Sequence, residues 1–124
     1  MISAGQTFVW CGDANIRHLY IAMNDSLACD GKIALFNLTG SVGGSASFVL
    51  KPGDHPYIRK ESDINFGDGI LTQATLLERN IKSRLAAPHA DMDGVLLEKI
   101  ARVAANHPAV SGEIKKLITE FWKF

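Results

Sequence analysis

The first 74 residues alternate between short apolar runs and polar or glycine-containing breaks, which is typical of strands joined by tight turns. The runs are rich in β-branched and aromatic residues. Asp30-Gly31 precedes the third run, and this dipeptide favours a hairpin because glycine tolerates positive φ. The pattern predicts an α+β fold that starts with a small antiparallel barrel or curled sheet of about five strands. The predicted strands are 7–11, 18–23, 32–38, 47–50 and 69–74.

From residue 75 onward the apolar positions follow a helical period. Residues 75–78 match a capping box, in which threonine and glutamate satisfy each other's free backbone donors, so a short helical turn is expected there. The clearest helix covers 93–106, and either Asp91 or Asp93 can cap its start. A last helix is predicted from Ser111 onward. We expect these C-terminal helices to close the barrel.

The chain ends on three aromatic residues within its last four positions. The simplest expectation is that the last helix packs them onto the barrel. The alternative is that they lie at an interface with a second copy or a partner, because aromatic residues are enriched at interfaces. The residues concerned are Phe121, Trp122 and Phe124.

The chain has 124 residues, which is the usual size of one domain, so we expect a single domain 1–124 with a β part at 1–74 and a helical part at 75–124. It carries 13 basic and 13 acidic residues. This neutral balance does not favour attraction of the whole molecule to nucleic acid or to a membrane surface. No apolar run is long enough to cross a bilayer and no signal peptide is visible. We therefore expect a cytoplasmic protein without a membrane partner.

The sequence lacks the spacings that mark common metal and cofactor sites. Its four histidines have no second ligand at a zinc spacing, and GxxxxGK[ST], GxGxxG and GxSxG motifs do not occur. We therefore expect neither a metal nor a cofactor. Cys11 and Cys29 show no CxxC spacing and are expected to act as small buried hydrophobic residues rather than as a disulfide.

Polar chemistry is concentrated at predicted strand ends and in the loop 51–62. Arg17 opens the second strand, Thr39 follows the third, and His55 lies in the loop, and such positions present reactive groups on a rigid scaffold. Structural interpretations remain open, because Arg17 could be a solvated cation and Thr39 a turn former. His55 could simply be held by Asp54. Further candidates for binding a substrate are His18, Arg59, Lys60 and Ser62.

The order of these elements resembles the MazF/PemK (Kid) toxins, which are small SH3-like barrels with a C-terminal helix. The resemblance covers about residues 5–105, and three positions depart from the family pattern. His18 stands where the family has proline after the arginine, Asn37 replaces another proline, and Gly40 follows the threonine. The matching segments are Gly5-Gln6-Thr7-Phe8-Val9, Arg17-His18-Leu19-Tyr20-Ile21, Leu35-Phe36-Asn37-Leu38-Thr39 and Ile70-Leu71-Thr72-Gln73-Ala74-Thr75-Leu76-Leu77.

The resemblance implies a metal-independent endoribonuclease that is the toxin of a toxin–antitoxin pair. It implies that Arg17 binds the scissile phosphate and that Thr39 donates a hydrogen bond to it, which suits a guanidinium and a hydroxyl. His55 would move the proton, since imidazole gives and takes protons near neutral pH. The partners implied are single-stranded RNA, an antitoxin protein and a second copy of the chain in a homodimer.

A non-catalytic protein-interaction module on the same barrel is the competing hypothesis. The related barrel of the CcdB gyrase poisons acts by binding a protein, so this fold does not decide the function. The two hypotheses differ in what they require of the structure. Catalysis requires Arg17, Thr39 and His55 to converge in one cleft, whereas dispersal of the three favours the binding module.

Overall fold

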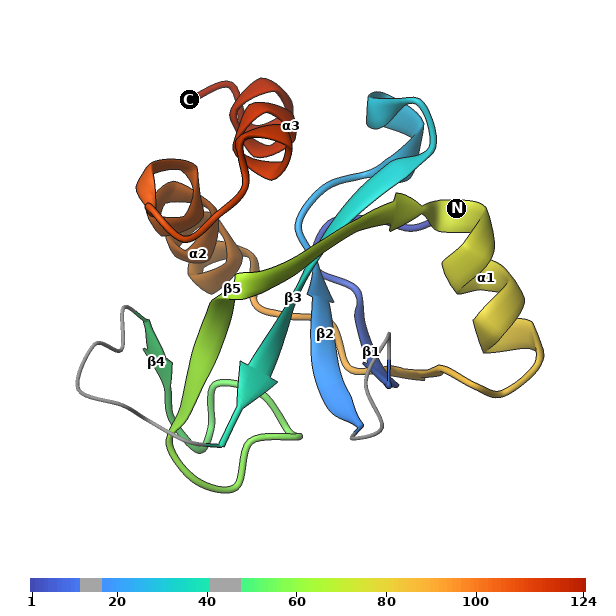
Figure 1. Cartoon of the computed structure of the whole chain (residues 1–124). Helices are drawn as coiled ribbons and strands as arrows, with labels where there is room; N and C mark the ends of the chain where they lie inside the picture. The colour runs from blue at the N-terminus through green and yellow to red at the C-terminus, as the bar shows by residue number, and fades with distance from the viewer. Residues whose placement is uncertain (12–16, 41–47) are drawn as a thin grey trace.

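The computed structural model describes residues 1–11, 17–40 and 48–124 (Figure 1). Residue 47 of the predicted fourth strand lies outside these ranges. No helix within the ranges is long and apolar enough to cross a lipid bilayer. In chain order the elements are β1 (Thr7–Trp10), β2 (His18–Ala22), the 3₁₀ helix η1 (Ser26–Cys29), β3 (Lys32–Thr39), β4 (Val49–Leu50), β5 (Ser62–Gln73), α1 (Ala74–Lys82), β6 (Ala87–His89), α2 (Gly94–Asn106) and α3 (Gly112–Trp122).

The described strands form one antiparallel sheet in the order β4-β5-β3-β2-β1-β6. The sheet is strongly curled, and together with the three α-helices it confirms the predicted α+β fold with C-terminal helices (Figure 1). The curl makes a half-barrel rather than a closed barrel, because β4 and β6 remain as outer strands. Strands β1, β2 and β3 pair in chain order and β4 pairs with β5, whereas β3 pairs with β5 and β1 pairs with β6 across longer stretches of the chain.

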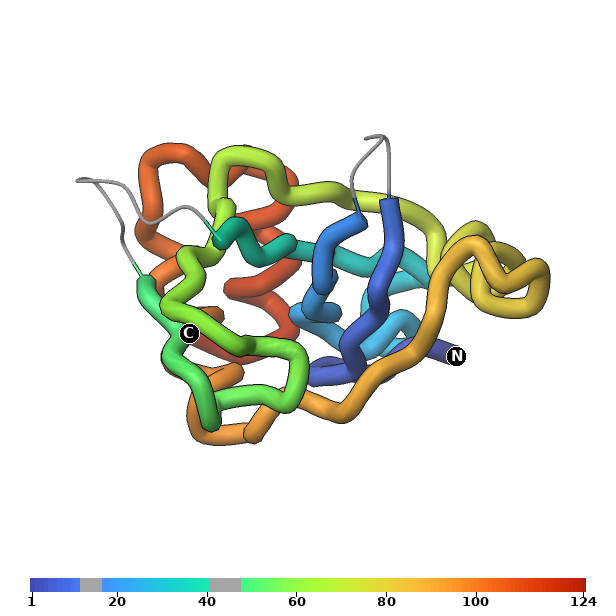
Figure 2. Tube along the Cα trace, turned by 90° about the horizontal axis from the view of Figure 1, so that it is seen from below, coloured from blue at the N-terminus to red at the C-terminus, as the bar shows by residue number. Residues whose placement is uncertain are grey.

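Both faces of the sheet are covered. On one face, α2 and α3 pack against Leu19, Ile21 and Phe36, whereas α1 packs against the opposite face around Tyr20 and Leu35 (Figures 1 and 2). This two-sided burial explains why the central strands read as continuous apolar runs instead of alternating with polar residues. Each fully buried large apolar side chain contributes about 1.5–3 kcal/mol to the free energy of folding.

Three elements differ from the sequence-based expectation. The predicted fifth strand at 69–74 is the second half of β5, which begins at Ser62. The segment before α2, where no strand is predicted, contains β6, whose three residues pair with β1. The first half of β5 is hard to predict because its buried Ile64 and Phe66 alternate with polar residues, and β6 is hard to predict because it is exposed and contains Pro88. The expected helical turn at 75–78 is a full helix, α1, without a side-chain cap.

The caps of the two C-terminal helices agree with the sequence. The side chain of Asp93 accepts a hydrogen bond from the backbone N–H of Leu96, and that of Ser111 accepts one from Ile114. These bonds satisfy donors that have no partner inside the helix, and each such cap stabilises a helix by about 1 kcal/mol. The caps fix where α2 and α3 begin and therefore which of their faces meets the sheet.

The C-terminal aromatic residues pack within this chain. The indole Nε1–H of Trp122 donates a hydrogen bond of 2.8 Å to the backbone carbonyl of Met23 at the end of β2. The guanidinium of Arg102 on α2 lies 4.5 Å from the centre of the Phe124 ring. The expectation that the last helix packs onto the sheet is therefore confirmed.

Residues 66–69 of β5 stand opposite a single residue of β3, because Asn65 pairs with Asn37 and Ile70 pairs with Leu35. This bulge bends the strand and increases its twist. It is accompanied by a close approach at Gly69, where a Cβ would lie 2.7 Å from the Phe36 ring and 3.1 Å from the Ile114 side chain. A side chain is therefore excluded at this position.

Gly69→Ala is expected to lower the free energy of unfolding by about 1–3 kcal/mol, because the packed Phe36 ring would have to move to admit a methyl group. Urea denaturation measures the change. Gly112→Ala is the matched control, since a Cβ there meets nothing within 4 Å and its stability should be equal or slightly raised. Equal stability of Gly69→Ala and the wild-type protein would contradict the close packing.

Candidate functional site

A pocket of about 580 Å³ lies at one end of the sheet, and its lining residues come from the start of β2, the end of β3, the loop before β5 and β6. The loop 51–61 runs beside the segment that carries β6, and the rings of His55 and His89 lie 5.0 Å apart (Figure 2). Strand ends thus supply one wall of the pocket and the loop supplies the other. The residues that line it are Arg17, His18, Leu38, Gly40, Pro56, Tyr57, Arg59, Lys60, Ser62 and His89.

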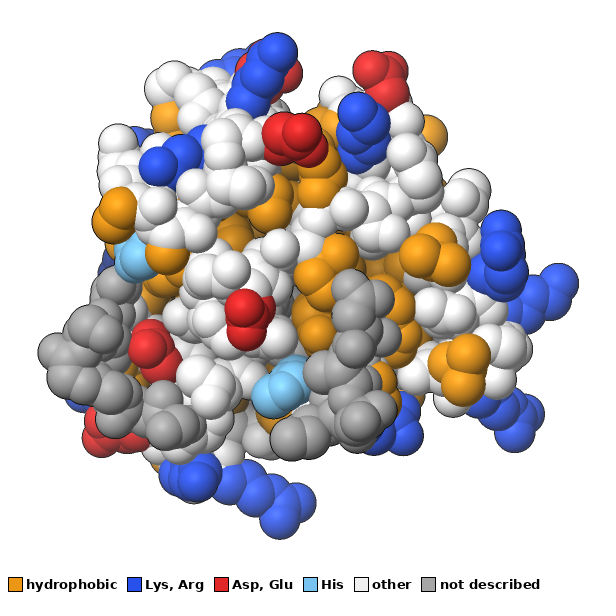
Figure 3. All heavy atoms as spheres, viewed as in Figure 1, with side chains coloured by type: hydrophobic (Ala, Val, Ile, Leu, Met, Phe, Trp, Pro, Cys, Tyr) orange, Lys and Arg blue, Asp and Glu red, His pale blue; other side chains and the backbone are white. Residues whose placement is uncertain are grey.

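The pocket is cationic. Arg17, Arg59 and Lys60 are exposed and line it together with two histidines, and none of the described lining residues is acidic. Lysine and arginine side chains project along the lower edge of the molecule, at the end of the sheet where the pocket lies (Figure 3). A neutral chain therefore presents a local positive surface, which favours an anionic ligand.

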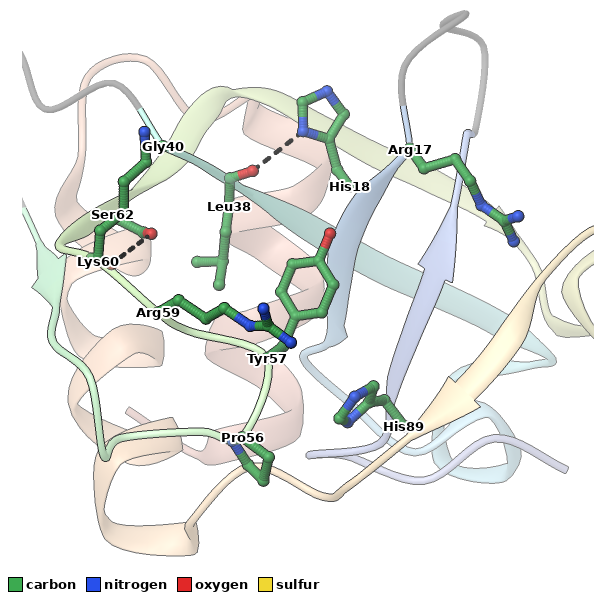
Figure 4. A pocket seen from close by; sticks show the side chains of 10 residues that line it. All are labelled: Arg17, His18, Leu38, Gly40, Pro56, Tyr57, Arg59, Lys60, Ser62 and His89. Carbon is green, nitrogen blue, oxygen red and sulfur yellow. Dashed lines mark hydrogen bonds between the residues drawn. The ribbon is translucent and has the colours of Figure 1, made fainter.

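The structure brings Arg17 and all four predicted substrate-binding residues to this one pocket. His18 is half-buried, and its Nδ1 lies 3.1 Å from the carbonyl oxygen of Leu38 (Figure 4). A carbonyl oxygen only accepts, so Nδ1 carries the proton and the neutral ring has its lone pair on Nε2. The hydroxyl of Ser62 donates 3.0 Å to the backbone carbonyl of Lys60, and this bond fixes the end of the loop.

Arg17 lies at the rim of the pocket. Its only described hydrogen bond is a long one of 3.5 Å from Nη2 to the carbonyl of Val9, and Figure 4 shows its guanidinium turned away from Lys60. Within the described part of the chain no carboxylate forms an ion pair with it. Its planar fork is therefore available for an anion, which a guanidinium binds in a bidentate manner.

His55 does not line the pocket, contrary to the convergence expected from the sequence. It is 2 % exposed, and its Nδ1 accepts a hydrogen bond of 3.1 Å from the backbone N–H of Tyr57. The proton is thus on Nε2, which donates to the carbonyl of Ala90 and lies 3.3 Å from the Thr7 hydroxyl. With both ring nitrogens engaged inside the protein, His55 joins the loop to the segment after β6. Asp54 does not hold it but accepts a bond from the N–H of Lys51.

Thr39 is also absent from the pocket lining. It is half-buried at the end of β3, where it pairs with Asp63 of β5. Only Arg17 of the three predicted catalytic residues therefore lines the pocket, and the roles of the other two remain predictions.

Among the lining residues that the sequence analysis missed, two have rings that can bind a ligand, Tyr57 and His89. Tyr57 lies between basic residues in the loop, and an aromatic residue interleaved with cations is a signal that could have identified it. His89 lies outside every strand and helix that the sequence predicts. It reaches the pocket only because β6 pairs with β1, which residue types in this exposed, proline-containing strand do not predict.

A second cavity of about 770 Å³ lies between η1 and α3 and has a different character. Three acidic and three basic residues line it, so it has no net preference for an anion. Cys29 lies there as a free, half-buried thiol, and burial raises its pKa above the usual value. Cys11 is likewise half-buried and free. A thiol with a raised pKa is a weak nucleophile, so this cavity does not offer an alternative reactive centre.

Comparisons with known proteins leave the site to be interpreted from its geometry. No family model, no curated protein and no solved structure matches the chain.

Proposed function

We propose that this protein binds single-stranded RNA at the cationic pocket and cleaves it without a metal ion, as an endoribonuclease of the MazF/PemK type. The observation that carries the proposal is the gathering of Arg17, Arg59 and Lys60 around one pocket that has no acidic residue in its described lining. The phosphate groups of RNA are anions that lysine and arginine side chains bind. The α+β half-barrel with C-terminal helices is compatible with the same family, although fold alone does not decide function.

The chemistry would use the RNA's own 2′-hydroxyl. Its oxygen forms a bond to phosphorus while the bond to the 5′-oxygen breaks, which leaves a 2′,3′-cyclic phosphate and a 5′-hydroxyl. One proton must leave the 2′-oxygen and one must reach the 5′-oxygen. Extra negative charge develops on the phosphate oxygens, and the Arg17 guanidinium suits the task of binding it.

His18 replaces His55 as the better candidate for taking the proton. Its bond to the Leu38 carbonyl keeps the proton on Nδ1, so Nε2 has the free lone pair that a general base needs. His89 differs, because its Nδ1 accepts a bond of 2.8 Å from the N–H of Ala90. A neutral His89 therefore carries its proton on Nε2 and can donate a hydrogen bond to RNA.

A protein-binding module is the second candidate, and the burial of His55 favours it. Two of the three predicted catalytic residues lie outside the pocket, and dispersal of that kind is what a non-catalytic module predicts. In this alternative the cationic pocket would bind an acidic segment of a partner protein. Within the family proposal, a cytoplasmic location, an antitoxin and a homodimer are part of the same hypothesis.

Incubation of the purified protein with long single-stranded RNA in EDTA tests the proposal. We expect fragments that end in a 2′,3′-cyclic phosphate, because the attacking group is the neighbouring 2′-hydroxyl, and EDTA excludes contaminating metal-dependent nucleases. The same RNA with 2′-O-methyl groups is the control and should stay whole, since it has no nucleophile. Intact RNA after incubation with folded protein would favour the binding module.

A further inference from the structure

We propose that Tyr57 is a stacking platform for one unpaired base of a single-stranded RNA. This inference rests on the proposed function and deepens it, because it explains why the pocket would take single strands and not a duplex. Tyr57 is 39 % exposed in a pocket whose other walls carry cations. Figure 4 shows its ring projecting into the pocket beside Arg59, between His18 and His89.

The Tyr57 ring is held although it is exposed. Its own backbone N–H donates to Nδ1 of the buried His55, and the N–H of Ile58 donates 3.0 Å to the His55 carbonyl. The His89 ring meets the Tyr57 ring edge to face, with centroids 5.9 Å apart and planes at 82°. His89 in turn is oriented by its bond from Ala90 and lies 5.0 Å from the His55 ring.

The two hydrogen bonds hold the backbone of Tyr57, and the contact with His89 limits the orientations of its ring. Three linked rings, from the buried His55 through His89 to Tyr57, leave the tyrosine little rotamer freedom to lose when a ligand binds. A preorganised aromatic face at the mouth of a pocket can accept the face of a base at low entropic cost. Every base has such a face, so the platform would tolerate different sequences.

The charges around Tyr57 match the same ligand. A single strand presents unpaired bases and a line of phosphates. Arg59 lies beside Tyr57, and Lys60 and Arg17 lie on opposite sides of it, with the Arg17 guanidinium turned outward (Figure 4). Phosphates on both sides of a stacked base would therefore meet cations. In a duplex the faces of each base are covered by its neighbours, so a base cannot reach Tyr57 without unstacking. The pocket is therefore expected to discriminate by base exposure as well as by charge.

The test compares two oligomers of equal charge. One is a 2′-O-methyl oligouridine, which cannot be cleaved, and the other is an abasic oligomer with the same number of phosphates. Tyr57→Ala should weaken binding of the oligouridine by roughly 5- to 150-fold, the range found when one stacking contact is removed. Binding of the abasic oligomer should hardly change, because the cations remain. Tyr57→Phe keeps the ring and should bind both oligomers like the wild-type protein.

Each outcome decides a different point. Equal losses on both oligomers, or wild-type protein that binds them equally well, would overturn the stacking role. Tyr57→Leu retains apolar bulk without an aromatic face, so wild-type affinity in that variant would also overturn it. A double-stranded RNA that binds as tightly as the single strand would do the same. Wild-type protein that binds neither oligomer would instead refute the proposed RNA-binding function, and the inference with it.

Discussion

Arg17→Ala is expected to slow RNA cleavage by about 100- to 1000-fold while the free energy of unfolding stays unchanged. The loss corresponds to about 2.7–4 kcal/mol of transition-state stabilisation, the effect of deleting one preorganised donor to a developing oxyanion. Stability should not change, because Arg17 is exposed and its only described hydrogen bond is 3.5 Å long. Initial rates on a fluorescent RNA, measured beside a urea denaturation curve, give both quantities.

Two control variants sharpen this experiment. Arg17→Lys keeps the charge but lacks the planar fork, so it should recover little activity. Arg79→Ala removes an exposed arginine on α1, outside the pocket lining, and should cleave RNA like the wild-type protein. An Arg17→Ala variant as active as the wild-type protein would contradict a role at the phosphate. Equal losses in the Arg17 and Arg79 variants would indicate a general effect of surface charge.

His55→Ala is expected to lower the free energy of unfolding by about 2–5 kcal/mol. The substitution leaves a cavity and removes the acceptor of the Tyr57 N–H and the donor to the Ala90 carbonyl. The loop and the segment after β6 would lose their main connection. Urea denaturation checks the change, and cleavage should fall only as far as the pocket loses its shape.

His89→Ala is the matched control for His55→Ala, because the two rings are neighbours but only His55 is buried. The His89 variant should stay within about 0.5 kcal/mol of the wild-type stability, as exposed substitutions usually do. A His55→Ala protein that is fully stable but inactive would show that the ring acts in the chemistry after all, as the sequence had suggested.

Much of the fold follows from local patterns in the sequence. Strands β1, β2 and β3 are visible as apolar runs, and α2 and α3 as helical periods with Asp93 and Ser111 at their starts. Local patterns do not predict two other strands. In the first half of β5 the buried Ile64 and Phe66 alternate with polar residues, and β6 is an exposed strand recognised only by its pairing with β1.

The candidate site residues also fall into two groups, those that local sequence predicts and those that depend on contacts between distant parts of the chain. Arg17, His18, Arg59, Lys60 and Ser62 could be selected because strand ends and polar loops present side chains, and the structure brings these five residues together. His55 shows the limit of that argument, because a polar loop residue can also face inward. Its burial depends on Thr7 and Ala90, which are 48 and 35 residues away along the chain. Contacts of that range cannot be derived from local pattern.

The outer strand β6 carries proline at its centre. Pro88 is the middle residue of this three-residue strand, which pairs with β1 on its other side. Proline has no N–H to donate, so this margin offers no regular ladder to an added strand. This arrangement protects one margin of an open half-barrel against edge-to-edge aggregation, the usual hazard of unclosed sheets. A protein partner that approaches β6 must therefore recognise side chains, since it cannot extend this margin with a strand of its own.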